Sequence, residues 1–460
     1  MGSEWPIVKF GEVLLDGARN GIYKRKEFHG AGIKIINMGE LFAYPRLRSV
    51  PMKRVELTAK ELEKSSLQPG DLLFARRSLV AEGAGKCSIV LEVDEPTTFE
   101  SSIIRCRPDP KKAHSLYLYY FFNSPQGRYL LGTIRRQVAV AGITGRDLVQ
   151  LEIPLPPLAQ QRAIAHILGT LDDKIELLRR MNETLEAMAR ALFKSWFVDF
   201  DPVIDNALEA GNPIPNELKE KAKRRLALGE RRKPLPEHIR RLFPDRFVDS
   251  ELGPIPEGWR VGTMAELVSL RRELVNPRDF PDEIFVHYSI PAFDNGRTPI
   301  SEPGRAIKSN KLLVPRNAVL LSKLNPRFPR VWMPIVSGSR RSICSTEFLV
   351  TIPNDGSSRE FIFCLFTEAG FRAKFSTLVT GTSGSHQRVN PRSFLTMQVV
   401  IPPNGVVELF TRFIQSPFEL ISENLVQSRT LAALRDTLLP KLISGEIRVR
   451  DEKKILEGLE

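Results

Sequence analysis

The side chains that could perform catalysis form no complete motif in this chain. Gly83-Ala-Gly-Lys-Cys87 resembles the end of a phosphate-binding loop, but Val80 replaces the earlier glycine and Cys87 replaces the required Ser or Thr. The two Pro-Pro pairs lack the acid or amide and the aromatic residue of an amino-methyltransferase motif. No Glu-x-Lys follows Pro281-Asp282 or Pro244-Asp245, and no two of the six histidines have metal-ligand spacing. The sequence therefore predicts no catalytic, cofactor-binding or metal-binding residue.

Clusters of basic and polar residues instead favour recognition of DNA. Arg and Lys hold phosphates, and Arg, Lys, Gln, Asn, Ser and His read base edges. Any one cluster is as compatible with a solvated surface as with a contact, but clusters occur in both halves of the chain. The predicted DNA-binding residues of the first half are Lys24, Arg25, Lys26, Arg76, Arg77, Arg135, Arg136 and Gln137. Those of the second half are Arg271, Arg272, Lys323, Arg327, Arg330, Arg340, Arg341, Ser383, Ser385, His386, Gln387 and Arg388.

The elements that must position these clusters occur twice. At an offset of 246 residues, Thr184 matches Thr430, Leu192 matches Leu438, and Pro156-Pro157 matches Pro402-Pro403. A period this long indicates duplication of a whole domain with a helix. Such a chain can place two similar surfaces about a pseudo-two-fold axis, as a homodimer does.

Composition and charge limit the class of protein. The 460 residues suffice for two or three domains, and 42% apolar residues favour a folded chain. No apolar run approaches 18 residues, no secretory signal begins the chain, and the four cysteines are scattered, so we expect a cytoplasmic location without disulfides or zinc. The net charge of +13 is concentrated in the two globular parts, which favours contact with a polyanion over ordinary solubility charge.

Local patterns predict mixed α+β domains. Short apolar runs at 72–74, 88–91 and 102–104 predict strands. The apolar run from Ser115 to Tyr129 predicts one buried helix. Thr144 and Asn390 each predict a helix start.

A proline-rich segment and a long helix follow each globular part. The first helix is predicted over 158–197, which is about 60 Å at 1.5 Å per residue. Apolar residues recur there in a heptad with one polar member, Asn182, as in a coiled coil. The second helix is predicted over 406–443, with Pro417 beginning or kinking it. The predicted seam comprises Ile164, Leu168, Leu171, Ile175, Leu178, Asn182, Leu185, Leu192, Ile421, Asn424, Leu431 and Leu438.

Several segments together resemble one protein family. They are Pro154-Leu-Pro-Pro-Leu-Ala-Gln-Gln-Arg162, Leu171-Asp-Asp-Lys-Ile175, Trp196-Phe-Val-Asp-Phe-Asp-Pro202, Ser250-Glu-Leu-Gly-Pro-Ile-Pro-Glu-Gly-Trp259 and Leu438-Leu-Pro-Lys-Leu-Ile-Ser-Gly-Glu-Ile447. This set is similar to the motifs of type I restriction-modification specificity subunits. Pro417 and the Asn404–Val407 stretch depart from the first copy of the pattern.

The resemblance implies a non-catalytic subunit with two DNA target-recognition domains, separated by two long antiparallel coiled-coil helices. The implied parts are a first recognition domain (1–153), a first long helix (154–204), a basic, Pro-rich connector (205–257), a second recognition domain (258–400), and a second long helix with a tail (401–460). The implied partners are double-stranded DNA, two adenine-N6 methyltransferase subunits and restriction (motor-nuclease) subunits. S-adenosylmethionine, ATP and Mg are implied in those partners and not in this chain.

Other interpretations stay open at this stage. The chain could be a stand-alone DNA-binding protein or regulator with two fused DNA-binding domains, which would not need an apolar helix seam large enough for a partner. It could also be a coiled-coil scaffold with two peptide-binding domains, which would show no salt-dependent DNA affinity. The basic connector could be a solvated linker or hairpin, or an arm that contacts phosphates.

Overall fold

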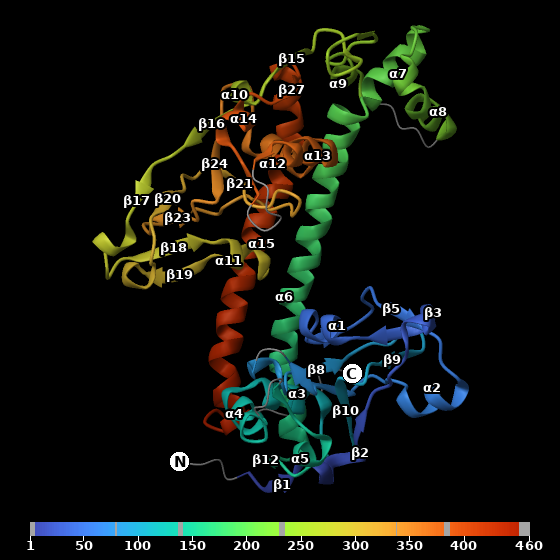
Figure 1. The fold of residues 1–460 in the computed structure, drawn as a ribbon, viewed down its shortest axis with the longest axis vertical. Coiled ribbons are helices and arrows are strands. Elements are labelled where there is room, and N and C mark those ends of the chain that lie inside the picture. Colours follow the sequence, from blue (N-terminus) through green and yellow to red (C-terminus); the bar gives the residue numbers. More distant parts are fainter. Residues whose placement is uncertain are drawn as a thin grey trace. The chain divides into compact units, whose positions relative to one another are not determined.

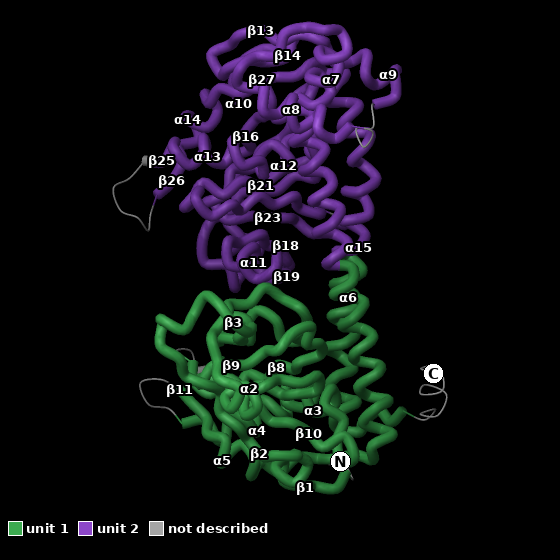
Figure 2. The backbone as a smooth tube through the Cα atoms, turned by 90° about the vertical axis from the view of Figure 1, so that its right-hand side faces the viewer, with its two compact units in different colours: residues 1–178, 426–460 green, residues 179–425 purple. Residues whose placement is uncertain are grey.

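The computed structural model describes residues 5–78, 81–136, 141–229, 235–336, 338–380 and 387–449. The chain divides into two compact units (Figure 2): unit 1 comprises residues 1–178 and 426–460, and unit 2 comprises residues 179–425. Each unit combines strands with helices, so the predicted mixed class is confirmed. The two long helices, α6 (Leu158–Phe193) and α15 (Asn404–Ser444), each contribute residues to both units (Figure 1).

Unit 1 is built on a five-stranded sheet of order β2-β10-β6-β8-β4, antiparallel except for the β4–β8 pair. Its strands are Leu14–Asn20, Ile103–Pro108, Leu72–Ala75, Cys87–Val90 and Arg46–Leu47. A second sheet has the order β5-β3-β9, and two pairs join β1 with β12 and β7 with β11. These strands are Lys53–Val55, His29–Ile36, Thr97–Phe99, Ile7–Lys9, Glu152–Pro154, Arg77–Ser78 and Ala141–Gly142. The short helices are α1 (Met38–Ala43), α2 (Ala59–Ser65), α3 (Ser115–Asn123), α4 (Pro125–Thr133) and α5 (Gly145–Val149).

The core of unit 1 includes one end of each long helix, namely the start of α6 and the end of α15. Every residue of β6 and β8 is buried, as continuous apolar runs predict for strands covered on both faces. Phe10 packs edge-on against Phe122, with 4.8 Å between ring centroids. The first turns of α6 and the last turns of α15 complete this core with Ala163, Ile164, Ala165, Leu168, Leu439, Leu442 and Ile443.

Unit 2 contains a four-stranded antiparallel sheet of order β16-β24-β21-β22 and a five-stranded sheet of order β17-β20-β23-β18-β19. The strands of the first are Val268–Arg271, Phe348–Pro353, Val319–Ser322 and Val331–Trp332. Those of the second are Leu274–Val275, Lys311–Leu313, Ser342–Cys344, Ile284–Tyr288 and Ile300–Pro303. The order β16-β24-β21 corresponds to β2-β10-β6 of unit 1. Three pairs join β13 (Phe247–Val248) with β14 (Ile255–Pro256), β15 (Arg260–Thr263) with β27 (Gln398–Ile401), and β25 (Val379–Thr380) with β26 (Arg388–Val389).

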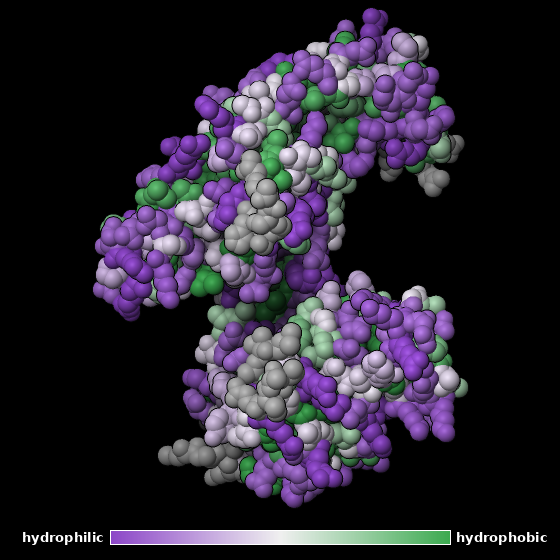
Figure 3. Space-filling view, viewed as in Figure 1, coloured by the Kyte–Doolittle hydropathy of each residue, from purple (hydrophilic) through white to green (hydrophobic). Residues whose placement is uncertain are grey.

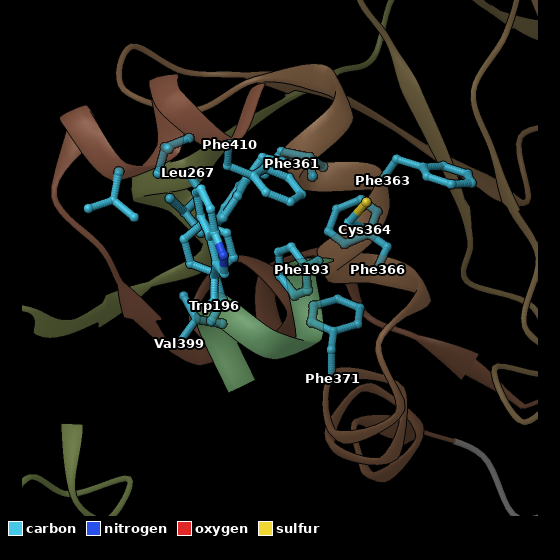
Figure 4. Packing of buried hydrophobic residues seen from close by; sticks show 14 of the residues in the cluster. Phe193, Trp196, Leu267, Phe361, Phe363, Cys364, Phe366, Phe371, Val399 and Phe410 are labelled. Carbon is cyan, nitrogen blue, oxygen red and sulfur yellow. The ribbon is translucent and has the colours of Figure 1, made fainter. Parts of the chain in front are cut away.

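An aromatic core holds α6 and α15 in unit 2 (Figure 4). Phe193 of α6 lies 5.8 Å from Phe410 of α15 and 5.4 Å from Phe361, measured between ring centroids. Full burial of one such side chain contributes about 1.5–3 kcal/mol. The helices around this core are α7 (Asp201–Ala210), α8 (Lys219–Ala227), α9 (Glu237–Arg240), α10 (Met264–Leu267), α12 (Arg359–Thr367), α13 (Ala369–Thr377) and α14 (Pro391–Leu395), whereas α11 (Ile290–Asp294) packs in a separate cluster with Tyr288 and Trp332.

Two helix predictions need correction. The single helix predicted over 115–129 is wrong, because Pro125 begins a second helix and Ser124 caps it by accepting from the Gly127 amide at 3.1 Å. A Cβ at Gly127 would lie 2.0 Å from the Phe121 carbonyl oxygen, so this turn requires glycine. Pro417 does not begin the second long helix, which starts at Asn404.

The early start of α15 has a physical cause. Val406, Val407 and Phe410 are buried in the unit 2 core, so their packing holds the turns before Pro417 in the helix. The other long helix, α6, ends at Phe193 and is followed directly by a π-helix, Lys194–Val198. Phe200 then turns the chain with a left-handed backbone conformation, at φ 58°.

The described part of the connector is folded. Leu218, Ile239 and Phe243 are buried in the same core as Trp196, whose ring centroid lies 5.1 Å from that of Phe243. The idea of a solvated linker is therefore wrong for these residues. The predicted boundary at residue 204 falls inside α7.

Candidate nucleic-acid interface

Unit 1 brings two separated arginine clusters onto adjacent strands. Gly142 of β11 lies opposite Arg77 of β7 on one side and opposite Arg136 on the other. The Arg136 amide donates to the Gly142 carbonyl at 2.9 Å, and the Ile143 amide donates to the Arg76 carbonyl at 3.0 Å. The clusters at 76–77 and 135–136 therefore share one edge of unit 1.

The four arginines on this edge differ in their partners. Arg77 is exposed and forms no ion pair with any described residue. Arg136 pairs with Asp147 at 2.8 Å, and half-buried Arg76 donates to the Ser101 carbonyl at 3.3 Å. Arg135 and Arg136 line a hollow of about 360 Å³, and the buried Nε of Arg135 has no described hydrogen-bond partner. Phosphate could be received here mainly by Arg77 and Arg135.

In the predicted basic cluster at residues 24–26, the positive charge of Lys24 is neutralised by an ion pair. Lys24 pairs with Glu61 of α2 at 2.9 Å and lies 5.0 Å from the ring centroid of Phe28. Hydrogen bonds from Lys24 and from Thr58 lower the pKa of Glu61 to about 2. Arg25 and Lys26 are exposed. Predicted residue Gln137 lies outside the described residues.

Unit 2 joins two of its predicted segments in a similar way. Leu324, two residues after the end of β21, bridges to Arg388 of β26, and the Val389 amide donates to the Lys323 carbonyl at 3.0 Å. The Asn325 amide donates to the Gln387 carbonyl at 2.9 Å. Ser383, Ser385 and His386, which precede β26 in the sequence, lie outside the described residues.

A cationic hollow of about 310 Å³ lies beside this junction. Arg271, Arg272 and Lys323 line it, together with apolar side chains that include Leu270, Leu312 and Leu349. No carboxylate lines it, and none of the three cations forms an ion pair with a described residue. The three positive charges are therefore available to an anion such as a DNA phosphate.

Other predicted basic residues of unit 2 already contact carboxylates. Arg330 binds Asp294 of α11 with 2.7 and 2.9 Å hydrogen bonds. Arg388 binds Glu347 through Nε and Nη2, with the shortest contact at 2.9 Å. Arg327 lies over the ring of Phe328 at 5.0 Å, and Arg340 is exposed.

Arg341 is held most firmly. Its guanidinium pairs with both carboxylate oxygens of Glu283 and stacks 3.9 Å from the ring centroid of Phe280. The hydrogen bond with Arg341 lowers the pKa of Glu283, and the same bond raises the pKa of Arg341. Arg341 is thus engaged in the structure of unit 2, and we expect it to contribute less to DNA affinity than Arg340.

The residues of the predicted seam are buried or half-buried in each unit. In unit 1, Ile164, Leu168 and Leu178 are buried, and Leu171, Ile175, Leu431 and Leu438 are half-buried. In unit 2, Asn182, Ile421 and Asn424 are buried, and Leu185 and Leu192 are half-buried. In unit 2, Asn182 contacts Asn424 and Phe193 contacts Phe410, so residue numbers rise along α6 as they fall along α15 and the pair is antiparallel.

The polar contacts that fix α6 in unit 1 were not predicted from the sequence. Asp172 accepts from Tyr120 of α3 at 2.7 Å and from Arg435 of α15 at 2.6 Å. Asp173 accepts from Arg46 and Arg48, each at 2.8 Å. The sequence feature that could have indicated these contacts is the pair Asp172-Asp173, which lies within the apolar heptad of α6.

The surface shows where further contacts are possible. Figure 3 shows the visible face of each unit as mainly hydrophilic, with smaller hydrophobic areas. Met181 and Met188 of α6 and Phe413 and Leu420 of α15 are exposed in unit 2, although helices usually bury such side chains. Within each pair the residues are seven apart, about two helical turns, so they share a helix face.

Other site chemistry is limited in the described part of the chain. No group of three or more His, Cys, Asp and Glu side chains is arranged to hold a metal ion among the described residues. All four cysteines are buried, and burial raises the pKa of each thiol. A search of the described helices found none with the length and hydropathy of a membrane span.

Known proteins resemble this chain over most of its length. Residues 2–187 match the family model of the type I restriction modification DNA specificity domain. The specificity subunit of the type I restriction enzyme HindI from Haemophilus influenzae is 24% identical, and the match covers 97% of this chain and 100% of that protein. The MjaIX specificity subunit of Methanocaldococcus jannaschii is 25% identical, with 97% and 94% covered.

A solved structure shares the fold. The crystal structure of the S subunit of a type I restriction-modification system from M. genitalium superposes with a TM-score of 0.51 at 14% identity, and 96% of each chain is covered. At this identity the likeness concerns the fold.

Proposed function

We propose that this chain, a member of the type I restriction-modification specificity subunits, reads a bipartite, asymmetric DNA site without catalysing a reaction itself. In this proposal residues 1–153 form the first recognition domain and residues 258–400 the second. The long-helix segments 154–204 and 401–460 and the connector 205–257 complete a pseudo-two-fold repeat. Each recognition domain reads one half-site.

One observation carries the proposal. In unit 1, β7 and β11 bring the arginines at 76–77 beside those at 135–136. In unit 2, the end of β21 and β26 bring Lys323 beside Arg388. The same kind of junction in both units supports one polyanion contact in each. Phosphate contacts fix the position of a protein on DNA, while base contacts supply specificity.

The exposed apolar side chains of the helices support docking of partners. Met181, Met188, Phe413 and Leu420 are exposed, whereas the face of each unit visible in Figure 3 is mainly hydrophilic. Exposed apolar surface rimmed by polar residues marks interaction sites. We assign this helix surface to two adenine-N6 methyltransferase (modification) subunits, which in turn bind the restriction subunits.

The catalytic steps are then carried out by the modification and restriction subunits. S-adenosylmethionine, ATP and Mg are bound by the modification and restriction subunits in this proposal. The antiparallel helices set the number of base pairs between the half-sites. The assembly works in the cytoplasm, where it reaches the host DNA.

The test is to map N6-methyladenine in cells that carry the modification gene with and without this gene. The expected result is one bipartite methylated motif that depends on this chain, together with co-purification of the chain and the modification subunit. Sequence-specific DNA binding without co-purification and without methylation would favour the stand-alone regulator. The absence of DNA binding would contradict both.

A further inference from the structure

A buried pair of asparagines interrupts the apolar contact between α6 and α15 in unit 2. Asn182 is 7% exposed and Asn424 is 4% exposed. Nδ2 of Asn424 donates to Oδ1 of Asn182 at 2.9 Å, and Nδ2 of Asn182 donates to the carbonyl oxygen of Ile421 at 3.4 Å. One hydrogen bond thus joins the two side chains across the helices, and Asn182 makes a second one to the backbone of α15.

Leucine would be the more stabilising residue at both positions. A polar side chain at a buried seam position lowers stability, but it specifies which residues can face each other. The reason is that an amide without its partner remains desolvated and unbonded. Paired asparagines therefore favour one register of the helices over all others.

The apolar residues next to the pair on the two helices discriminate less between registers. Leu185 and Leu425 are only half-buried, and Met181 and Met188 are exposed. A slide of one heptad in one direction would set Asn424 against Ala189 and Asn182 against Leu431. Leucine and alanine offer no side-chain hydrogen bond, so the bond between the two amides would be lost.

We propose that the Asn182–Asn424 pair admits a single stagger of α6 against α15 and thereby a single length of DNA spacer. The proposal rests on the proposed function, because only a reader of two half-sites has a spacer preference. Because both side chains are buried between the helices, Asn182 and Asn424 are positioning residues that act through α6 and α15.

The experiment uses the complex of this chain with its modification subunits and a set of plasmids whose half-sites are separated by different spacers. The variants are Asn182→Leu/Asn424→Leu and, without added volume, Asn182→Ala/Asn424→Ala. Methylation at each spacer is measured by sequencing, and unfolding of each variant is followed by circular dichroism. The wild type is expected to methylate one spacer length.

For the leucine pair we expect an unfolding midpoint equal to or above that of the wild type, together with a rise of at least about tenfold in relative methylation at neighbouring spacers. The alanine pair should relax the spacer preference in the same way, even where its stability falls. Each single variant, Asn182→Leu or Asn424→Leu, leaves one buried amide without its partner and should unfold more easily than the double variant.

The matched control is Ala187→Leu/Ala433→Leu, which adds two leucines at exposed positions of the same helices and should leave the spacer ranking unchanged. An active leucine pair that keeps the wild-type spacer ranking would overturn the role of the asparagines. Absence of any bipartite methylation by the wild type would instead overturn the proposed function.

Discussion

Arg435 of α15 binds the buried carboxylate of Asp172 of α6, with 2.6 Å between Nη1 and Oδ1. The second oxygen of Asp172 accepts from the hydroxyl of Tyr120 at 2.7 Å. One carboxylate therefore connects three helices of unit 1, and both of its oxygens are used. Because Asp172 is 9% exposed, its charge is separated from water and depends on these partners.

We expect Asp172→Ala to destabilise unit 1 by about 3 kcal/mol, since a buried hydroxyl loses its acceptor and the partly buried guanidinium of Arg435 keeps only Asp436. Denaturation in urea, followed by fluorescence, measures this loss. Asp173→Ala is the control, because the Asp173 side chain is 54% exposed and exposed ion pairs contribute about 0–1 kcal/mol. Equal effects of the two substitutions would contradict the assignment.

Removal of the three cations of the unit 2 hollow should weaken DNA binding in a salt-dependent way. For Arg271→Gln/Arg272→Gln/Lys323→Gln, three lost phosphate contacts lower the slope of log K against log salt by about 2.7 in magnitude, at about 0.9 per contact. Fluorescence anisotropy of a labelled duplex across a salt series gives the slope. Arg330→Gln/Arg341→Gln serves as the comparison and should mainly lower stability, because both residues bind carboxylates. The hollow is not a phosphate site if the triple variant keeps the wild-type slope.

Exchange of residues 258–400 for the matching part of a relative should change one half-site and leave the other unaltered. The reason is that the basic junction of unit 2 is formed within that segment, whereas the junction of unit 1 is formed by residues before 143. Methylome sequencing of the exchanged complex shows the outcome. A change in both half-sites would indicate a shared recognition surface.

Insertion of one heptad after Leu178 and one after Asn424 should lengthen the preferred spacer. Seven residues add about 10 Å of helix and keep the seam in phase. At about 3.4 Å per base pair, the preferred spacer grows by roughly three base pairs. Both inserts leave the pairs Asn182–Asn424 and Asp172–Arg435 able to form. The quantity to compare is the ranking of spacer lengths, because rotation of the half-sites about the duplex also lowers affinity. An unchanged ranking would show that the helices do not set the spacer length.

Unit 2 should lose stability in mild acid through His287. This imidazole is 9% exposed and contacts Glu302 at 2.7 Å, and burial lowers its pKa despite that carboxylate. The folded state therefore binds fewer protons than the unfolded state in the window below 6.5, the ordinary value, and stability falls as the pH drops through that window. His287→Gln should reduce the difference in urea midpoint between pH 7.5 and pH 5. His238→Gln, at an exposed position, should not.

The sequence predicted the elements whose signals are local. The strands Leu72–Ala75 and Cys87–Val90 were predicted at 72–74 and 88–91, because apolar runs bounded by turn residues are typical of buried strands. Helix starts at Thr144 and Asn390 were predicted from the Thr-x-x-Asp spacing and from the proline after Asn390, and both side chains accept helix amides. The break at Pro125 was missed, because the apolar run on both sides of it favoured one continuous helix.

The composition of the candidate interface could be predicted only in part. Which arginines keep a free guanidinium depends on carboxylates that the fold brings close. Glu283 is 58 residues from Arg341, and Asp294 is 36 residues from Arg330. The same limit applies to the hollow of Arg271, Arg272 and Lys323, whose members come from separate strands. Sequence pattern and charge indicate candidate DNA-binding residues, and the contacts formed in the folded chain determine which of them keep an unpaired positive charge.

The division of the long helices between the units determines the order in which the units can fold. Unit 2 is continuous in the sequence and can complete its core once residue 425 has left the ribosome. Unit 1 lacks Leu439, Leu442 and Ile443 until these residues are synthesised, and residue 443 follows residue 178 by about 265 residues. At about 5–20 residues per second this delay is roughly 13–53 s. During that time Ile164 and Leu168 lack part of their cover, so unit 1, which begins first, completes its core after unit 2.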